Sequence, residues 1–224
     1  MKEGNRLVKR AYRCAKQAIL CGKYGPGEAL FESHLATDLG MSRTPVREAL
    51  QLLAREGFVE ANPARGYLVP RFTAEDMREL FEVRESLEGM ATRAAALYAS
   101  NAEIEKLERI CDEYEAAKND VDTWTKLGAE FHSRIIDASR NRRLAIILDS
   151  LKDQIMLCRR SSFQGGQYRR DDALREHLAI LNAIKSGDGD AAEQHARIHV
   201  RHSHEAALRS FSRHFDPSSL QKNP

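Results

Sequence analysis

The chain has 224 residues, of which 42% are hydrophobic and 30% are charged, and its formal net charge at pH 7 is +2. This length is sufficient for two modest domains that each bury a core. No apolar stretch approaches the ~18 residues of a membrane-spanning helix, and no signal peptide is recognisable, which disfavours membrane and secreted proteins. The four cysteines form no C-x-x-C pair, so we expect reduced thiols and a cytoplasmic protein.

Charge is distributed unevenly along the chain. Residues 1–72 contain 12 Lys and Arg against 7 Asp and Glu, a balance of +5, whereas the remainder contains 23 against 26, a balance of −3. A basic module joined to a mildly acidic body is typical of a DNA-binding domain attached to a sensing or dimerising domain. We therefore expect one domain at 1–72, a second at 73–214 and a disordered tail at 215–224.

The first domain has the pattern of a helix-turn-helix. A helix is predicted at about 6–21, followed after a glycine-rich run by a short helix at 35–39. Gly40 suits the left-handed position that follows a helix. The next helix is expected to begin with Thr44 as its N-cap and Pro45 in its first position. In this pattern the second helix of the pair reads DNA.

The predicted reading helix has two distinct faces. An apolar stripe at i, i+4 and i+7 should be buried, and it consists of Val46, Leu50 and Leu53. Arg43, Arg47 and Gln51 share another face, and arginine is well suited to phosphate oxygens and guanine edges. An ordinary amphipathic helix with a solvated basic face is the alternative interpretation.

Two short β-prone runs follow the reading helix, at 57–60 and 66–69, and a turn-rich segment at 61–65 separates them. This spacing predicts a β-hairpin wing. Arg65 would lie near its tip, within reach of a phosphate or a minor groove.

Several motifs occur in order along the first seventy or so residues: Gly25-Pro26-Gly27-Glu28-x-Leu30, Leu35-Ala36-x-x-Leu39-Gly40-Met41-Ser42-Arg43-Thr44-Pro45-Val46-Arg47-Glu48-Ala49-Leu50, Glu56-Gly57-Phe58-Val59 and Arg65-Gly66. Their order and spacing resemble the winged-helix domain of the GntR family of bacterial transcription regulators. The resemblance implies DNA contacts from Ser42, Arg43, Thr44 and Arg47 at the reading helix and from Arg65 and Gly66 on the wing.

The second domain shows helical periodicity and no convincing strand. Helices are predicted at about 76–99, 101–118, 121–139, 141–162, 170–186 and 188–212, with a loop at 161–166. Six or so antiparallel helices around one core form an all-α bundle. The expected fold is therefore mainly α, a winged helix-turn-helix with a small β-hairpin wing followed by an all-α helical bundle.

Four motifs span this second domain: Leu80-Phe81-Glu82-Val83-Arg84-x-x-Leu87-Glu88, Phe131-His132-x-x-Ile135, Glu176-His177-x-x-Ile180-Leu181-x-Ala183-Ile184-x-x-Gly187-Asp188 and Ala196-Arg197-Ile198-His199-Val200-Arg201-His202. They resemble the ligand-sensing FCD domain of the FadR subfamily within the GntR family. Many such domains hold a divalent metal with one Asp and three His. The resemblance assigns the histidines to His132, His177 and His199, but Gly128 stands at the Asp position.

Three imidazoles alone can still bind zinc or nickel, with water or a ligand carboxylate in the open positions. Without the Asp the site is one unit more positive, which favours an anionic effector such as an organic acid. The alternative is three polar residues that hydrogen-bond inside the bundle. The resemblance also implies that Arg84 pairs with the effector, and an ion pair with Glu88 at i+4 is the other interpretation.

The motifs favour a regulator over an enzyme. The sequence has no H-E-x-x-H, E-x-x-H, G-x-S-x-G, phosphate loop or dinucleotide fingerprint. A metal-dependent enzyme using the three histidines is the alternative, and a DNA-architectural protein without an effector is another. We expect a homodimeric transcription regulator, most simply a repressor, that binds a palindromic double-stranded operator and responds to a small carboxylate.

Overall fold

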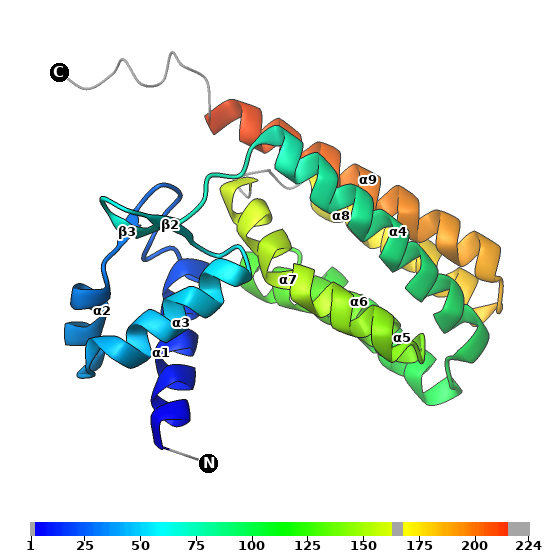
Figure 1. Cartoon of the computed structure of the whole chain (residues 1–224). Helices are drawn as coiled ribbons and strands as arrows, with labels where there is room; N and C mark the ends of the chain where they lie inside the picture. Colours follow the sequence, from blue (N-terminus) through cyan, green and yellow to red (C-terminus); the bar gives the residue numbers. More distant parts are fainter. Residues whose placement is uncertain (1–2, 163–167, 215–224) are drawn as a thin grey trace. The chain divides into compact units, whose positions relative to one another are not determined.

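The computed structural model describes residues 3–162 and 168–214 (Figure 1). The predicted disordered tail lies outside the described residues, as does most of the loop predicted at 161–166. The start of that loop was placed wrongly, because a helix extends to Ser162. The chain divides into two compact units, residues 1–73 and 74–224, and each is described by itself.

The first unit is a winged helix. Its elements are α1 (Glu3–Leu20), β1 (Ala29–Leu30), α2 (Glu32–Leu39), α3 (Arg43–Arg55), β2 (Glu60–Asn62) and β3 (Gly66–Leu68). β3 is the central strand of an antiparallel sheet, pairing with β1 on one side and β2 on the other. The predicted β-hairpin wing is confirmed. β1 was not predicted, because a two-residue strand carries no periodicity.

The core of the first unit lies between α1, α3 and the sheet. Val46, Leu50 and Leu53 are almost completely buried, which confirms the apolar stripe of the reading helix. Phe58 and Val59, predicted to lie in a strand, are buried residues that precede β2. Their apolar character therefore reflects core packing and not strand pairing.

In its described residues the second unit is entirely helical: α4 (Ala74–Tyr98), α5 (Asn101–Ala116), α6 (Val121–Ala138), α7 (Arg142–Ser162), α8 (Tyr168–Lys185) and α9 (Gly189–His214). These bounds lie within a few residues of the predicted ones, and the predicted fold class is confirmed. α4 packs along α9, as Figure 1 shows. No helix in the described part of the chain is long and apolar enough to cross a membrane.

Local signals set the ends of the helices that carry the candidate site. Ser100 and Glu103 form a capping box at the start of α5. The Asp120 carboxylate accepts hydrogen bonds from the backbone N–H groups of Asp122 and Thr123 at the start of α6, both at 3.2 Å. Helices α5, α6, α8 and α9 then share a core that includes Leu107, Phe131, Ile180 and Ala192. The long helices are thus held rigidly around the histidines that three of them carry.

Candidate functional site

The predicted DNA-reading residues are exposed at the start of α3. Ser42, Arg43, Thr44 and Arg47 are exposed, whereas Pro45 and Val46 face the core. The N-cap is Ser42 and not Thr44, so that prediction was wrong. Pro45 is the third helical residue, where its missing N–H still costs nothing because no N–H of the first turn has an acceptor within the helix.

Arg47 is held by a residue of α2. Its Nε donates to both carboxylate oxygens of Glu32, at 3.0 and 3.1 Å. The side chain of Arg47 nevertheless stays 57% exposed. Sequence reasoning missed Glu32, because the pair is 15 residues apart and joins two different helices.

The wing turn is organised by Asn62. Its Oδ1 accepts hydrogen bonds from the backbone N–H groups of Ala64 at 3.0 Å and Arg65 at 2.9 Å, and the Arg65 side chain is exposed. Gly66 has φ +73°, and a Cβ there would lie 2.9 Å from the carbonyl oxygen of Leu30. The sheet therefore requires glycine at this position independently of any contact with DNA.

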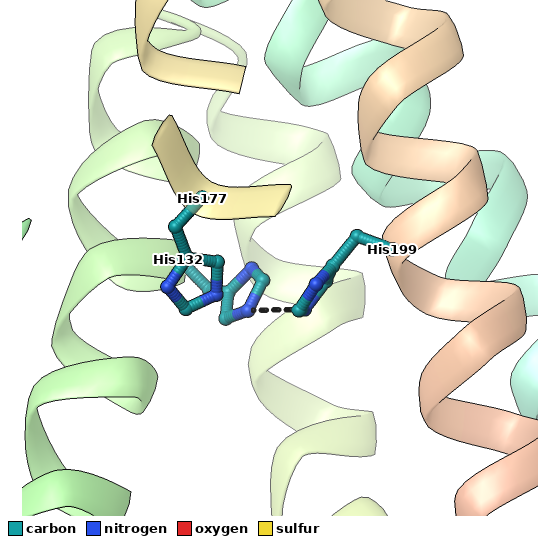
Figure 2. Close-up of side chains that lie close together, drawn as sticks. All are labelled: His132, His177 and His199. Carbon is teal, nitrogen blue, oxygen red and sulfur yellow. Dashed lines mark hydrogen bonds between the residues drawn. The ribbon is translucent and has the colours of Figure 1, made fainter. Parts of the chain in front are cut away.

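Three histidines from three helices converge inside the second unit (Figure 2). His132 lies on α6, His177 on α8 and His199 on α9, and each offers a ligand nitrogen within 4.8 Å of the others. His177 and His199 are buried, and His132 is half-buried. The Nε2 atoms of His132 and His199 lie 3.2 Å apart.

Two carboxylates fix the orientation of two of these imidazoles. His132 Nδ1 lies 3.2 Å from Glu88 of α4, and His199 Nδ1 lies 2.7 Å from Glu176 of α8. A carboxylate accepts, so each Nδ1 carries a proton, and when the ring is neutral its Nε2 presents a lone pair. Two lone pairs at this separation repel one another unless they share a proton or a cation.

The spacing of one pair of imidazoles, His132 and His199, also matches a metal centre. Tetrahedral zinc with Zn–N bonds of ~2.0–2.1 Å places two ligand nitrogens about 3.3 Å apart. The 3.2 Å between the two Nε2 atoms is close to that value. Sequence reasoning identified the three histidines but missed Glu88 and Glu176 in this role. A carboxylate behind the imidazole, as His132 and His199 have, is the arrangement that metal-ligating histidines usually have.

Tyr114 explains how the chain accommodates the glycine at position 128. A Cβ on Gly128 would lie 3.2 Å from Cε2 of Tyr114, which is 2% exposed. The Tyr114 ring also lies against His177, with ring centroids 5.0 Å apart. The space beside His132, where the resemblance places a carboxylate, is therefore bordered by an aromatic ring.

Arg84 is buried, only 2% exposed, and pairs with Glu88. Its Nε lies 2.6 Å from Glu88 Oε1 and its Nη2 lies 3.3 Å from Oε2, so the ion pair that was the alternative interpretation is present. Burial by itself would raise the pKa of Glu88, but the charges of Arg84 and His132 hold that pKa well below its usual range. Arg84 Nη1 is buried and has no hydrogen-bond partner among the described residues.

Glu176 connects the histidines to the protein surface. Its Oε1 accepts from Nδ1 of the exposed His202, at 2.7 Å. Both residues border a groove of about 460 Å³ between α8 and α9, whose lining comprises Asp172, Arg175, Glu176, Ala179, His195, Ile198, His202, Glu205 and Arg209. This groove contains neither Arg84 nor any of the three converging histidines.

Comparison with known proteins identifies the family. The model of the bacterial regulatory proteins, gntR family, matches residues 7–69, and the FCD domain model matches residues 79–202. The chain is 34% identical over 194 residues to the HTH-type transcriptional regulator YdhC of Bacillus subtilis, covering 85% of this chain and 86% of the relative. The chain belongs to the GntR family.

A second relative is also a transcriptional regulator, and a solved structure shares the fold. The Nta operon transcriptional regulator of Aminobacter aminovorans is 32% identical over 170 residues, covering 75% of this chain and 80% of that protein. The structure of E. coli McbR/YncC shares the fold, with a TM-score of 0.77 at 20% identity over 94% of this chain and 100% of that one. The relatives are transcription regulators, which confirms the expectation of a regulator and not an enzyme.

Proposed function

We propose that this GntR-family chain is a homodimeric repressor of the FadR subfamily. It binds a palindromic operator through α3 and the wing, and it releases DNA when a small carboxylate binds beside the three histidines. The observation that supports the proposal most strongly is the combination of an exposed arginine face on a winged-helix reading helix with three converging imidazoles, of which two are buried.

The DNA contacts are assigned to side chains that the first unit leaves exposed. Arg43, Thr44 and Arg47 project from the first turns of α3, and Ser42 lies at its N-cap. The N-terminal residues of a reading helix are those that reach base edges and phosphates. The exposed Arg65 at the wing turn adds a cation for a phosphate or a minor groove. Gly66 accompanies it as the residue that permits the turn.

The effector site is assigned to the interior of the second unit. His132, His177 and His199 would hold Zn²⁺ or Ni²⁺, and when bound the metal supplies a positive charge and an open position for a carboxylate oxygen. The buried Nη1 of Arg84 is a donor for the other carboxylate oxygen. An anion would also offset the cationic excess of a site that lacks an Asp at position 128.

The dimer is assigned to an apolar face of α4. Val83, Met90 and Leu97 recur at i, i+7 and i+14, and they are 47%, 51% and 58% exposed. Residues at this spacing share one side of a helix, the pattern of a surface that packs on another helix. A second copy is the partner, because one winged helix makes too few contacts for operator-level affinity.

Met90→Lys should therefore convert the dimer to a monomer. The substitution buries a charge at the centre of the proposed interface but leaves the core of the unit intact, since Met90 is 51% exposed. Analytical ultracentrifugation of the full chain measures the change. Met156→Lys, the same substitution at a 43% exposed methionine on α7, is the matched control. A monomeric wild type would contradict the assignment.

The proposal as a whole is tested by DNA release. A duplex selected by the full chain from a random-sequence pool serves as operator, and its dissociation constant is measured by fluorescence anisotropy with zinc-loaded protein. Acetate, lactate, succinate and gluconate are added in turn, each beside its neutral amide. We expect a carboxylate, and not its amide, to weaken DNA binding, and removal of zinc by a chelator to abolish that response. Unchanged affinity in every case would contradict the carboxylate response.

A further inference from the structure

The ion pair between Glu32 and Arg47 crosses the turn of the helix-turn-helix. Glu32 is the first residue of α2, and its side chain is only 24% exposed, whereas that of Arg47 is 57% exposed. Both carboxylate oxygens approach the same nitrogen, Nε, at 3.0 and 3.1 Å. Within the described part of the chain, neither terminal nitrogen of Arg47 has a hydrogen bond.

We infer that Glu32 is a positioning residue for DNA recognition, which holds Arg47 by Nε so that Nη1 and Nη2 face the DNA as a fixed fork. The inference depends on the proposed DNA contact of Arg47. A guanidinium has five N–H donors, and a guanine edge or a phosphate is contacted by two of them in parallel. Because Nε donates to Glu32, the two terminal nitrogens Nη1 and Nη2 stay available for the guanine edge or the phosphate.

The physical advantage is preorganisation. An exposed arginine samples many rotamers, and ordering it on binding DNA costs free energy. A side chain that is already fixed at Nε loses less freedom when its terminal nitrogens bind. The benefit appears only where both terminal donors meet a matching partner, so it increases affinity for the correct sequence more than for DNA in general.

Simple electrostatics predicts the opposite effect of removing Glu32 on DNA affinity. A carboxylate near the reading face repels phosphates, so its removal should strengthen binding to every DNA sequence. Glu32 also lies in the first turn of α2, where its charge favours the helix N-terminus, so its removal affects helix stability as well. The experiment must separate positioning from both effects.

Two duplexes are compared, one selected by the full-length protein from a random pool and one shuffled with the same composition. The measured quantity is the dissociation constant for the shuffled duplex divided by that for the selected duplex, so a lower ratio means less sequence specificity. Glu32→Ala should weaken binding to the selected duplex by about threefold to tenfold per reading helix, with the shuffled duplex bound equally or more tightly. Glu32→Gln retains one acceptor oxygen and should fall between wild type and Glu32→Ala. Glu48→Ala, which removes an exposed carboxylate of α3 itself, should leave the ratio unchanged.

Four results would overturn the inference or the DNA contact on which it depends. If Glu32→Ala and Glu32→Gln both tighten both duplexes equally, only charge matters. If Glu32→Ala still lowers the ratio when Arg47 is already alanine, Glu32 acts through the stability of α2. Should Arg47→Ala itself leave the selected duplex unaffected, the proposed contact of Arg47 fails. A loss with Arg47→Ala but none with Glu32→Ala overturns the positioning role alone.

Discussion

Arg47→Ala is expected to weaken binding to the selected operator duplex by about 1–3 kcal/mol for each reading helix, and to relax sequence preference at one base pair of each half-site. The substitution removes a positive charge and also the two terminal N–H donor groups that the contact with Glu32 leaves available. Fluorescence anisotropy against the selected duplex and its single-base variants measures both effects.

Arg55→Ala is the matched control for Arg47→Ala. Arg55 is an exposed arginine in the last turn of the same helix, so its removal changes the charge equally. Arg55 lies outside the proposed DNA contacts, so Arg55→Ala should change affinity little and leave base preference unchanged, whereas Arg47→Ala should change both. Equal losses on all sequences for the two variants would show that Arg47 contributes only charge.

His199→Ala is expected to abolish metal-dependent stabilisation of the full chain. A ligand that binds only the folded state stabilises it by about 4 kcal/mol when its concentration is a thousand times its dissociation constant. Without His199 two imidazoles remain, and Glu176 loses the ring that it orientates. Thermal unfolding of chelator-stripped protein, with and without Zn²⁺ or Ni²⁺, measures the difference.

His195→Ala is the control for this loss. His195 lies on the same helix, one turn before His199, and lines the surface groove instead of the interior site. It should retain the wild-type response to metal, and calorimetric titration should give one metal ion per chain for both proteins. If the wild type and His199→Ala bind metal equally, the three histidines are not the metal site.

The local features of the winged helix could be predicted from the sequence because they repeat within one or two helical turns. The apolar stripe of α3 follows from a spacing of three and four residues, and Gly40 ends α2 with φ 61° as predicted. The N-cap of α3 was placed wrongly because Ser42 and Thr44 are both good capping residues. Proline is tolerated throughout the first turn and does not distinguish between them.

The polar contacts between helices could not be predicted in this way. His132, His177 and His199 are 45 and 22 residues apart, and only the resemblance to a family grouped them. Glu88 and Glu176 were visible in the motifs, but their contacts with His132 and His199 depend on how α4, α6, α8 and α9 rotate about their axes. The contact of Glu32 with Arg47 could not be predicted either, because it depends on how α2 and α3 are rotated about their axes.

The contact between Tyr114 and Gly128 makes two distant sequence positions interdependent. A side chain at position 128 must displace part of a buried aromatic ring that also lies against His177. An aspartate there is compatible with the bundle only if the residue at position 114 becomes smaller or moves. Whether one substitution is enough for a four-ligand site therefore depends on whether the Tyr114 ring can shift by a few tenths of an ångström, and that ring also contacts His177.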